Sequence, residues 1–222
     1  SIDGDTMVIG ARQDDDKGTD SGSVYVFTRD TAGDLTSGWT QAAKLTASDG
    51  ASSDYFGISV SIDGDTVVVG AFWDDDKGGN SGSAYVFTRD TAGDLASGWT
   101  QVAKLTADDG AADDWFGISV SIDGDTVVIG AYYDDDKGGN SGSAYVFTRA
   151  TASDLASGWT QVAKLTADDG AADDYFGISV SIDGDTIVVG AYYDDGSAYV
   201  FTRDTASDLA SGWTQVAKLT AD

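Results

Sequence analysis

The sequence predicts an all-β protein, and more specifically a β-propeller made of four-stranded antiparallel blades. The chain repeats itself every 60 residues, since SIDGDT begins at residues 1, 61, 121 and 181. Each repeat contains four strand-like segments. The 222 residues include 29 Gly and 38 acids, every one an Asp, which favour turns over helices. Four-stranded sheets repeated radially form propellers of about four to eight blades, whereas the strand modules of an open β-solenoid, the alternative, repeat at shorter periods.

The third repeat shows the four segments in order. Residues 116–122 alternate apolar and small side chains, as a strand does. Residues 126–133 form a continuous apolar run, typical of a strand buried on both faces, and the DGD between these two segments is a tight hairpin signal. Residues 143–149 alternate again, and residues 159–166 have one polar face. This order predicts a sheet that runs from a crowded axis to solvent.

The repeats define blades at about 1–48, 49–108, 109–168 and 169–222 of a single propeller. The first begins at SID, so we expect it to lack its inner strand. An unpaired inner strand leaves buried backbone groups without partners. We therefore expect ring closure to use residues beyond Asp222 or another chain, the alternative being that this is a segment of a longer array of blades.

A recurring motif gives a family resemblance. Phe56-Gly57, Phe116-Gly117 and Phe176-Gly177 are each followed, fourteen residues after the glycine, by an alanine in VGAF, IGAY or VGAY. These segments resemble the FG-GAP repeat, the blade motif of integrin α-subunit propellers, and the YVF and WTQ segments resemble its bacterial variety. The resemblance covers essentially the whole chain and implies an extracellular or cell-surface protein that works through adhesion or ligand binding.

The sequence departs from that pattern at two points. The proline of GAP is replaced throughout, by Arg12, Phe72, Tyr132 and Tyr192. The long calcium loop that integrins carry between the first two strands of a blade is also missing, because DGD is too short to wrap an ion. The resemblance therefore implies no calcium at that turn.

The charge restricts the partners. A formal net charge of −26 argues against nucleic acid and anionic membranes, which require a basic surface. No apolar run approaches the roughly 18 residues of a membrane span, so we expect no membrane insertion. A protein or glycan ligand, or a cation, suits such a surface better.

The loop after the second strand of a blade, DDDKGGN, is the candidate metal site. Alternating oxygen ligands with glycines for a sharp turn suit a hard cation such as calcium, and a solvated acidic turn is the alternative. The fourth repeat has lost DKGGNS from this loop, so we expect no site there. The candidate ligands are Asp14, Asp16 and Asp20, then Asp74, Asp76 and Asn80, then Asp134, Asp136 and Asn140.

Successive strands of a blade run in opposite directions, so alternate connections lie on the same face. This loop and the linker between repeats therefore share one face, where aromatic residues also gather. Aromatic rings beside carboxylates can stack on sugars or seat a cationic group, although packing between blades is the alternative for at least half of them. The candidates for ligand binding are Tyr55, Phe72, Trp73, Trp115, Tyr132, Tyr133 and Tyr175. One tryptophan recurs at the same position of every repeat, and we expect these four to be core residues: Trp39, Trp99, Trp159 and Trp213. One arginine recurs likewise, and we expect these four to form ion pairs with nearby aspartates: Arg29, Arg89, Arg149 and Arg203.

The residue types argue against an enzyme. Without His and Cys there is no Ser–His or Cys–His nucleophile and no usual zinc site. Paired aspartates can hydrolyse glycosides, but here every aspartate cluster repeats, whereas a catalytic centre usually breaks symmetry. We expect a non-catalytic binding or adhesion module. A purely structural propeller is the second interpretation, and a glycan-processing enzyme is the third.

Overall fold

The computed structural model of the chain describes residues 1–151, 154–155, 157–206, 208–209 and 211–220. Within these ranges all regular structure is β-strand, so the predicted fold class is confirmed. Asp222, where the fourth blade is expected to end, lies outside the described residues. The sixteen strands form four separate antiparallel sheets, and in each sheet the spatial order of the strands is their order in the chain.

The sheets have the same plan, and their bounds follow the repeat. The first contains β1 (Ile2–Asp3), β2 (Thr6–Ala11), β3 (Ser23–Arg29) and β4 (Trp39–Leu45). The second contains β5 (Val60–Asp63), β6 (Thr66–Ala71), β7 (Ser83–Arg89) and β8 (Trp99–Leu105). The third contains β9 (Ser119–Asp123), β10 (Thr126–Ala131), β11 (Ser143–Arg149) and β12 (Trp159–Leu165). The fourth contains β13 (Phe176–Asp183), β14 (Thr186–Ala191), β15 (Ser197–Arg203) and β16 (Trp213–Leu219). The first sheet thus keeps two residues of its inner strand.

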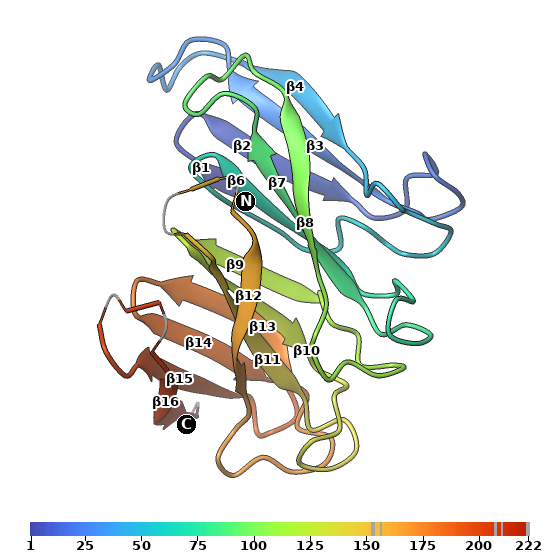
Figure 1. The fold of residues 1–222 in the computed structure, drawn as a ribbon, viewed down its shortest axis with the longest axis vertical. Coiled ribbons are helices and arrows are strands. Elements are labelled where there is room, and N and C mark those ends of the chain that lie inside the picture. The colour runs from blue at the N-terminus through green and yellow to red at the C-terminus, as the bar shows by residue number, and fades with distance from the viewer. Residues whose placement is uncertain (152–153, 156, 207, 210, 221–222) are drawn as a thin grey trace.

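The sheets follow one another along the long axis of the molecule, from β1–β4 at the top of Figure 1 to β13–β16 at the bottom. Each inner strand contacts the inner strand of the next sheet, as β5 contacts β9 and β9 contacts β13. No strand pairing joins the first sheet to the last among the described residues, so the arrangement is propeller-like but not closed.

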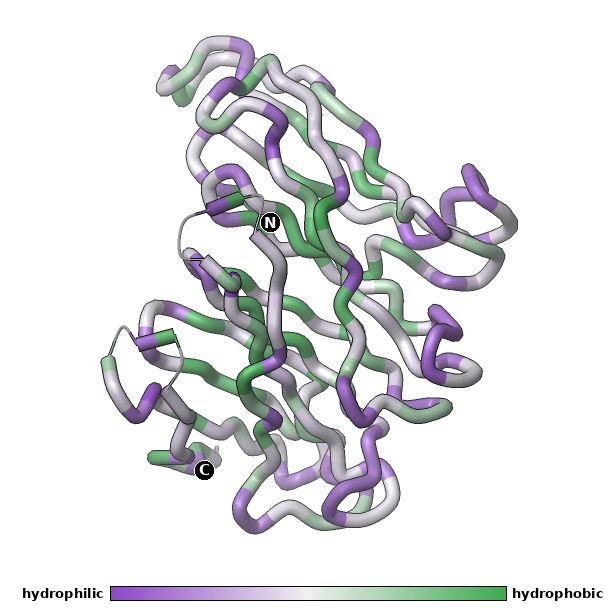
Figure 2. Tube along the Cα trace, in the orientation of Figure 1, coloured by the Kyte–Doolittle hydropathy of each residue, from purple (hydrophilic) through white to green (hydrophobic). Residues whose placement is uncertain are grey.

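Three apolar cores lie between successive sheets, and the second strands of the two middle sheets, β6 and β10, are buried on both faces. On β6, Val67 and Val69 belong to the core shared with the first sheet, whereas Val68 belongs to the core shared with the third. On β11, Tyr145 and Phe147 face one core while Ala144 and Val146 face the other, as the alternation predicts. The hydrophobic segments in Figure 2 accordingly follow the strands, and the hydrophilic segments follow the loops.

The inner strands begin later than the sequence predicts in two of the repeats. We expected a strand from Phe116, but β9 begins at Ser119, and Phe116 instead makes a bridge to Gly82 of the preceding sheet. The following glycine disturbs the pairing, because Gly117 has a φ of +92°, a conformation that interrupts the pleat. In the fourth repeat, where Gly177 has a φ of +94°, β13 does begin at Phe176, but its register shifts between Phe176 and Ser179. The Phe-Gly pair therefore forms a link between blades, with the phenylalanine side chain buried in the core.

The glycine of the VGA segment forms the other half of this link. A Cβ atom on Gly70 would lie 1.8 Å from the carbonyl oxygen of Gly117 in the next sheet, and one on Gly130 would lie 1.9 Å from that of Gly177. Only a residue without a side chain permits so close an approach of two backbones. The spacing between Phe-Gly and Gly-Ala recurs in the chain because the two segments form the contact between one repeat and the next.

Arginine and tryptophan side chains brace the other end of each sheet. The predicted ion pairs are confirmed, since Arg89 bonds to Asp65 at 2.7 Å, and the equivalents of this pair recur in every repeat. The four tryptophans are half-buried, and Trp99, Trp159 and Trp213 pack against the three cores. The guanidinium of Arg89 covers one face of the Trp99 ring, with 4.5 Å between guanidinium carbon and ring centre.

Candidate functional site

The site lies where the second strand of each sheet ends and the linker from the preceding repeat passes. Parity of strand direction predicts that these two segments meet on one face. The structure agrees, because Asp49 of the linker and Asp74 of the following loop both bond to Lys104 on β8. The sequence folds this way because β6 stops at Ala71, where Asp74 closes a turn by donating its N–H to the carbonyl of Ala71.

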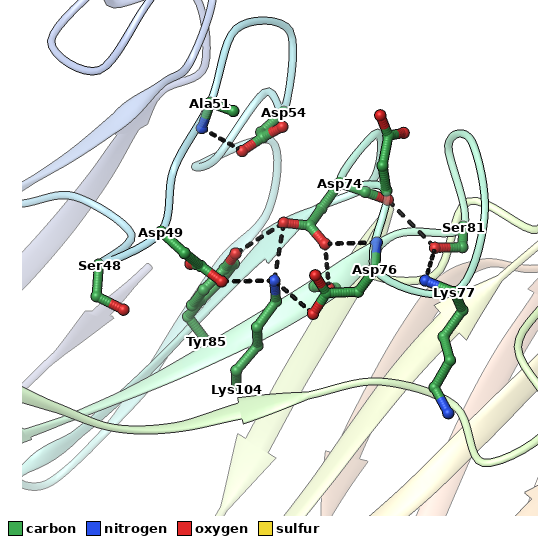
Figure 3. A network of polar contacts seen from close by, with 12 residues as sticks. Ser48, Asp49, Ala51, Asp54, Asp74, Asp76, Lys77, Ser81, Tyr85 and Lys104 are labelled. Carbon is green, nitrogen blue, oxygen red and sulfur yellow. Dashed lines mark hydrogen bonds and ion pairs between the residues drawn. The ribbon is translucent and has the colours of Figure 1, made fainter.

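A lysine occupies the centre of the carboxylate cluster (Figure 3). The ammonium of Lys104 lies 2.6 Å from Asp76, 2.8 Å from Asp49 and 3.0 Å from Asp74. Asp74 is buried, and it also accepts hydrogen bonds from the hydroxyls of Ser83 at 2.7 Å and Tyr85 at 2.9 Å. We call this arrangement of one lysine among aspartates the lysine cage.

Equivalent cages occur in all four repeats, but their composition differs. Lys164 bonds to Asp109, Asp134 and Asp136 in the third repeat, which repeats the second. The two terminal repeats have one carboxylate fewer each. The first has Lys44 with Asp14 and Asp16, and the fourth has Lys218 with Asp169 and Asp194. The shortened loop of the fourth repeat thus keeps its lysine.

The cage holds its lysine charged. Burial of Lys104 opposes the charged form, but the hydrogen bonds to Asp49, Asp76 and Asp74 outweigh it and raise the lysine pKa above its ordinary value. Burial likewise works to raise the pKa of Asp49, and the hydrogen bonds from Lys104 and Tyr85 overcome it, so that this pKa is lowered. The contacts between Lys104 and Asp49 therefore favour the charged form of both groups.

The structure separates the third predicted ligand from the other two. Asn80 has a φ of +54°, donates its backbone N–H to Asp75, and donates its side-chain amide to Asp113 at 2.8 Å. Asn140 repeats these contacts with Asp135 and Asp173, and Asp20 uses its backbone N–H in the same way toward Asp15. The asparagine serves the left-handed turn, for which Asn and Asp are favoured.

Two residues of the cage were not among the candidates from the sequence, namely Lys104 and Asp49. A signal for the lysine exists, because AKL recurs in every repeat although the chain has only 12 Lys and Arg. The lysine lies two strands away from the aspartates in the sheet, and sequence spacing alone does not place it there.

The clusters of three carboxylates could hold a metal ion by their spacing. Ligand oxygens of Asp49, Asp74 and Asp76 lie within 4.8 Å of one another, and so do those of Asp109, Asp134 and Asp136. The lysine ammonium already bonds to all three oxygens, and a second cation in the same place would face strong repulsion. As folded, the cage therefore suits an ammonium group and not a calcium ion beside it.

The predicted aromatic residues do come together, in a single row across the repeats. Tyr55 packs against Trp73 at 5.0 Å between ring centres, Phe72 against Trp115 at 5.0 Å, and Trp115 against Tyr133 at 4.5 Å. We call this set the aromatic row. It continues through contacts among Tyr132, Tyr133, Tyr175, Tyr192 and Tyr193, and it starts at Arg12, whose guanidinium stacks on Tyr55.

The linker rings of the row sit on strained backbone. Tyr55, Trp115 and Tyr175 have φ values of +54°, +58° and +56°. A bulky residue in this left-handed region is an outlier that costs about 1–2 kcal/mol. The strain recurs at the same position of three repeats, and it is offset by hydrogen bonds such as that from the N–H of Trp115 to the carbonyl of Asn80 at 3.2 Å.

Two clefts open along the row. One of about 290 Å³ is lined by Trp115 and Tyr133 together with Asp113, Asp135 and Asn140. Another of about 250 Å³ is formed almost wholly by rings, from Tyr132, Tyr133, Tyr175, Tyr192 and Tyr193, with Ile178. Tyr192 and Tyr193 are 65% and 67% exposed, whereas Phe72 is buried, so the row becomes more accessible toward the fourth repeat.

Comparison with known families settles the resemblance. The FG-GAP repeat pattern matches residues 1–27, 39–87, 99–147 and 159–201, which is most of the chain. The chain belongs to the FG-GAP repeat family. No curated protein gave a match.

In this FG-GAP repeat protein, the two halves of the motif meet between blades. The Phe-Gly of one repeat packs on the Gly-Ala of the preceding repeat, as Gly117 does on Gly70. The position that follows Gly-Ala, a proline in the family's name, is aromatic in three repeats and belongs to the aromatic row. FG-GAP propellers are generally non-catalytic and often occur in adhesion or binding proteins and in extracellular proteins.

A search of the described residues for a helix long and apolar enough to span a membrane found none.

Proposed function

We propose that this FG-GAP repeat protein is a non-catalytic binding or adhesion module of an extracellular or cell-surface protein. Its ligand is a protein or a glycan that docks on the aromatic row and the acidic loops beside it. The observation that carries the proposal is the row itself, a line of rings held by three strained linker residues and hollowed into two clefts.

A neutral glycan fits the clefts best. Each cleft is near the lower end of the size of ligand sites, which suits one sugar ring. Tyrosine and tryptophan faces stack on the apolar face of a sugar, and Asp113, Asp135 and Asn140 offer hydrogen-bonding groups at the rim. The charge of −26 disfavours acidic glycans by long-range repulsion.

The repetition of the site supports binding over catalysis. A cage with the same contacts occurs in the second and third repeats, with Lys104 and Lys164 in the same role. Neither carries a group that the other lacks, so no repeat is singled out as a reaction centre. The two clefts of the aromatic row differ in lining but lie side by side, and they suit several weak contacts with a repetitive ligand, which add up through avidity.

We propose that calcium is not required for ligand binding. The ion can enter a cage only where the lysine ammonium leaves it, so the proposed ligand binding does not depend on calcium. We expect the melting temperature of the wild type to stay unchanged at millimolar calcium, and that of Lys104→Met to rise, because a ligand of the native state stabilises it by mass action. A rise in the wild type that Asp74→Asn abolishes would contradict this.

An array of neutral and acidic oligosaccharides tests the ligand. We expect binding of neutral glycans with and without a chelator, and at least a tenfold loss of affinity in Tyr133→Ala and Tyr193→Ala, since truncating an aromatic residue at the centre of a binding site costs about 2 kcal/mol or more. Leu35→Ala is the control, because Leu35 is 83% exposed and lies outside the row. If no oligosaccharide on the array binds, the glycan hypothesis is wrong and a protein ligand is left. If all variants bind equally well, the aromatic row is not the binding site.

A further inference from the structure

The cleft between Trp115 and Tyr133 contains carboxylates that the neighbouring cleft lacks. It measures about 290 Å³, and its walls include Asp113 and Asp135 beside the two rings. The cleft of about 250 Å³ next to it shares Tyr133 but is otherwise formed by tyrosines and Ile178. We call the first the carboxylate cleft and the second the ring cleft. A ligand that spans both therefore meets two different kinds of surface.

The chain supplies no basic partner to the carboxylates of the first cleft. In the third repeat, the lysine cage takes up the aspartates on either side of Asp135 and leaves Asp135 itself outside. No ion pair of the described residues includes Asp113 or Asp135. Asp135 accepts the backbone N–H of Asn140 at 2.7 Å, and Asp113 accepts the side-chain amide of Asn80 at 2.8 Å. Both donors are neutral, so the cleft can still receive a cation.

The same chain shows how it seats a cation on an aromatic ring. In the cage of the third repeat, the ammonium of Lys164 lies 5.2 Å from the ring centre of Tyr145 and bonds to aspartates around it. On the aromatic row, the guanidinium of Arg12 lies 5.7 Å from the ring centre of Tyr55, which occupies the same linker position as Trp115. Ring faces attract cations through their quadrupole. The carboxylate cleft combines ring faces with carboxylates in the same way.

The rings favour a glycan over a single basic side chain. The planes of Trp115 and Tyr133 stand at 80° to each other with 4.5 Å between centres, and both rings are half-buried. Such rings stack on the apolar face of a sugar. Because Tyr133 also lines the ring cleft, the next sugar of the same glycan can follow there. A lysine side chain of a protein would occupy the carboxylate cleft alone.

We propose that the carboxylate cleft selects a sugar with a free amino group, in a glycan whose adjoining sugars are neutral. The inference rests on the proposed glycan binding and names the sugar that this part of the site prefers. Neutral sugars stack on the rings of either cleft. An ammonium group gains, in addition, contacts with Asp113 and Asp135 and with the ring faces. Acetylation of the amino group removes its charge, and with it these additional contacts.

Isothermal titration calorimetry with two tetrasaccharides tests the preference. One is a tetrasaccharide of N-acetylglucosamine, and the other is the same compound with one internal unit deacetylated. The buffer is at about pH 6, where amino groups are protonated, and contains about 0.15 M NaCl to screen long-range attraction. We expect the wild type to bind the deacetylated compound about tenfold more tightly, because a charge-assisted hydrogen bond and a cation–π contact are added.

The double variant Asp113→Ser, Asp135→Asn removes both charges and keeps the rings. Serine suits the backbone there, since Ser53 at the equivalent linker position has a φ of +71° against +66° for Asp113. Asparagine keeps an oxygen for the N–H of Asn140. We expect this variant to bind both tetrasaccharides with the affinity that the wild type has for the acetylated one.

Asp15→Asn combined with Asp20→Asn is the matched control. It removes two charges from the equivalent loop of the first repeat, where Gln13 stands in place of Tyr133. The position of Asp20 is already asparagine in the second and third repeats, and Asp15 accepts a backbone N–H as Asp135 does. The control should keep the preference of the wild type. Equal loss in both double variants would show attraction by the net charge of −26 alone, and would overturn the proposal.

The remaining outcomes separate this inference from the proposed function. If the wild type binds both tetrasaccharides equally, the preference for an amino sugar is wrong while glycan binding stands. If neither tetrasaccharide binds, glycan binding itself is wrong and the inference fails with it. A short peptide with one lysine is the third probe. If it binds more tightly than the deacetylated tetrasaccharide and loses affinity in the cleft variant, the cleft receives the ammonium of a protein, and the amino sugar is excluded.

Discussion

At the scale of single residues, two aspartates beside the cages are the most unusual acids of the chain. Burial raises the pKa of Asp54 to about 6, against the hydrogen bond from the N–H of Ala51 that lowers it, and the same causes raise the pKa of Asp114 to about 6. An unfolded aspartate titrates near pH 4. The folded state therefore holds these protons more tightly, and this contribution to stability, complete below about pH 4, is lost as the pH rises through 6.

The substitution Asp54→Asn removes the buried charge while keeping an oxygen that can accept from Ala51. We expect its melting temperature to exceed that of the wild type by about 2–4 °C at pH 8 and to show no gain at pH 4. Asp195→Asn, on an exposed turn, changes the net charge equally and should show neither effect. A gain of equal size at both pH values would mean that the effect does not come from titration.

At the scale of the element, the contact between a VGA glycine and the next Phe-Gly carbonyl fixes how blades approach. Gly130→Ala would place a Cβ atom 1.9 Å from a backbone oxygen, so the sheets must separate, and we expect a loss of about 3 kcal/mol in the free energy of unfolding. Gly190→Ala is the matched control, because in the fourth sheet the nearest atom is the Ser179 hydroxyl oxygen, which can rotate away. Urea unfolding measures both, and equal losses would show that the backbone approach is not the cause.

At the scale of the whole molecule, 38 aspartates against 12 basic residues produce strong self-repulsion. Screening by salt weakens interactions among exposed charges more than those inside the partly buried cages. We expect the melting temperature to rise steadily between about 0.02 and 0.5 M NaCl, since the compact state suffers most from the repulsion. A melting temperature that falls with salt would show that the attraction between lysines and aspartates outweighs the repulsion.

How much of this follows from the sequence depends on the range of the contact. Strand type and the alternation of Tyr145 and Val146 follow from the sequence, because the pleat has a fixed period of two. The contact between the linker that joins two repeats and the loop after the second strand also follows from the sequence, because strand direction alternates within a blade. The interruption of the inner strand at Gly117 could not be predicted, because it depends on a backbone approach between different repeats.

The candidate site was predictable in part for the same reason. The aromatic row contains every ring named from the sequence, since those residues end successive strands and linkers on one face. The cage was harder, because its centre comes from Lys104, two strands away from the loop, and because Asn80 is required by a left-handed turn. Local spacing identifies oxygen ligands but does not show which cation reaches them.

The lysine cage also determines how far the structure of its loops depends on the ions in the surrounding solution. A positive charge attached to the chain cannot be diluted, chelated or exchanged for another ion, so the loops that it gathers are independent of the mineral content of the surroundings. Toward high pH, the event that would release Asp49, Asp74 and Asp76 is loss of the lysine proton, and the raised pKa of Lys104 shifts it above the ordinary titration range of a lysine. We therefore expect the same hydrogen-exchange protection of the cage loops in a chelating buffer as in one rich in divalent cations.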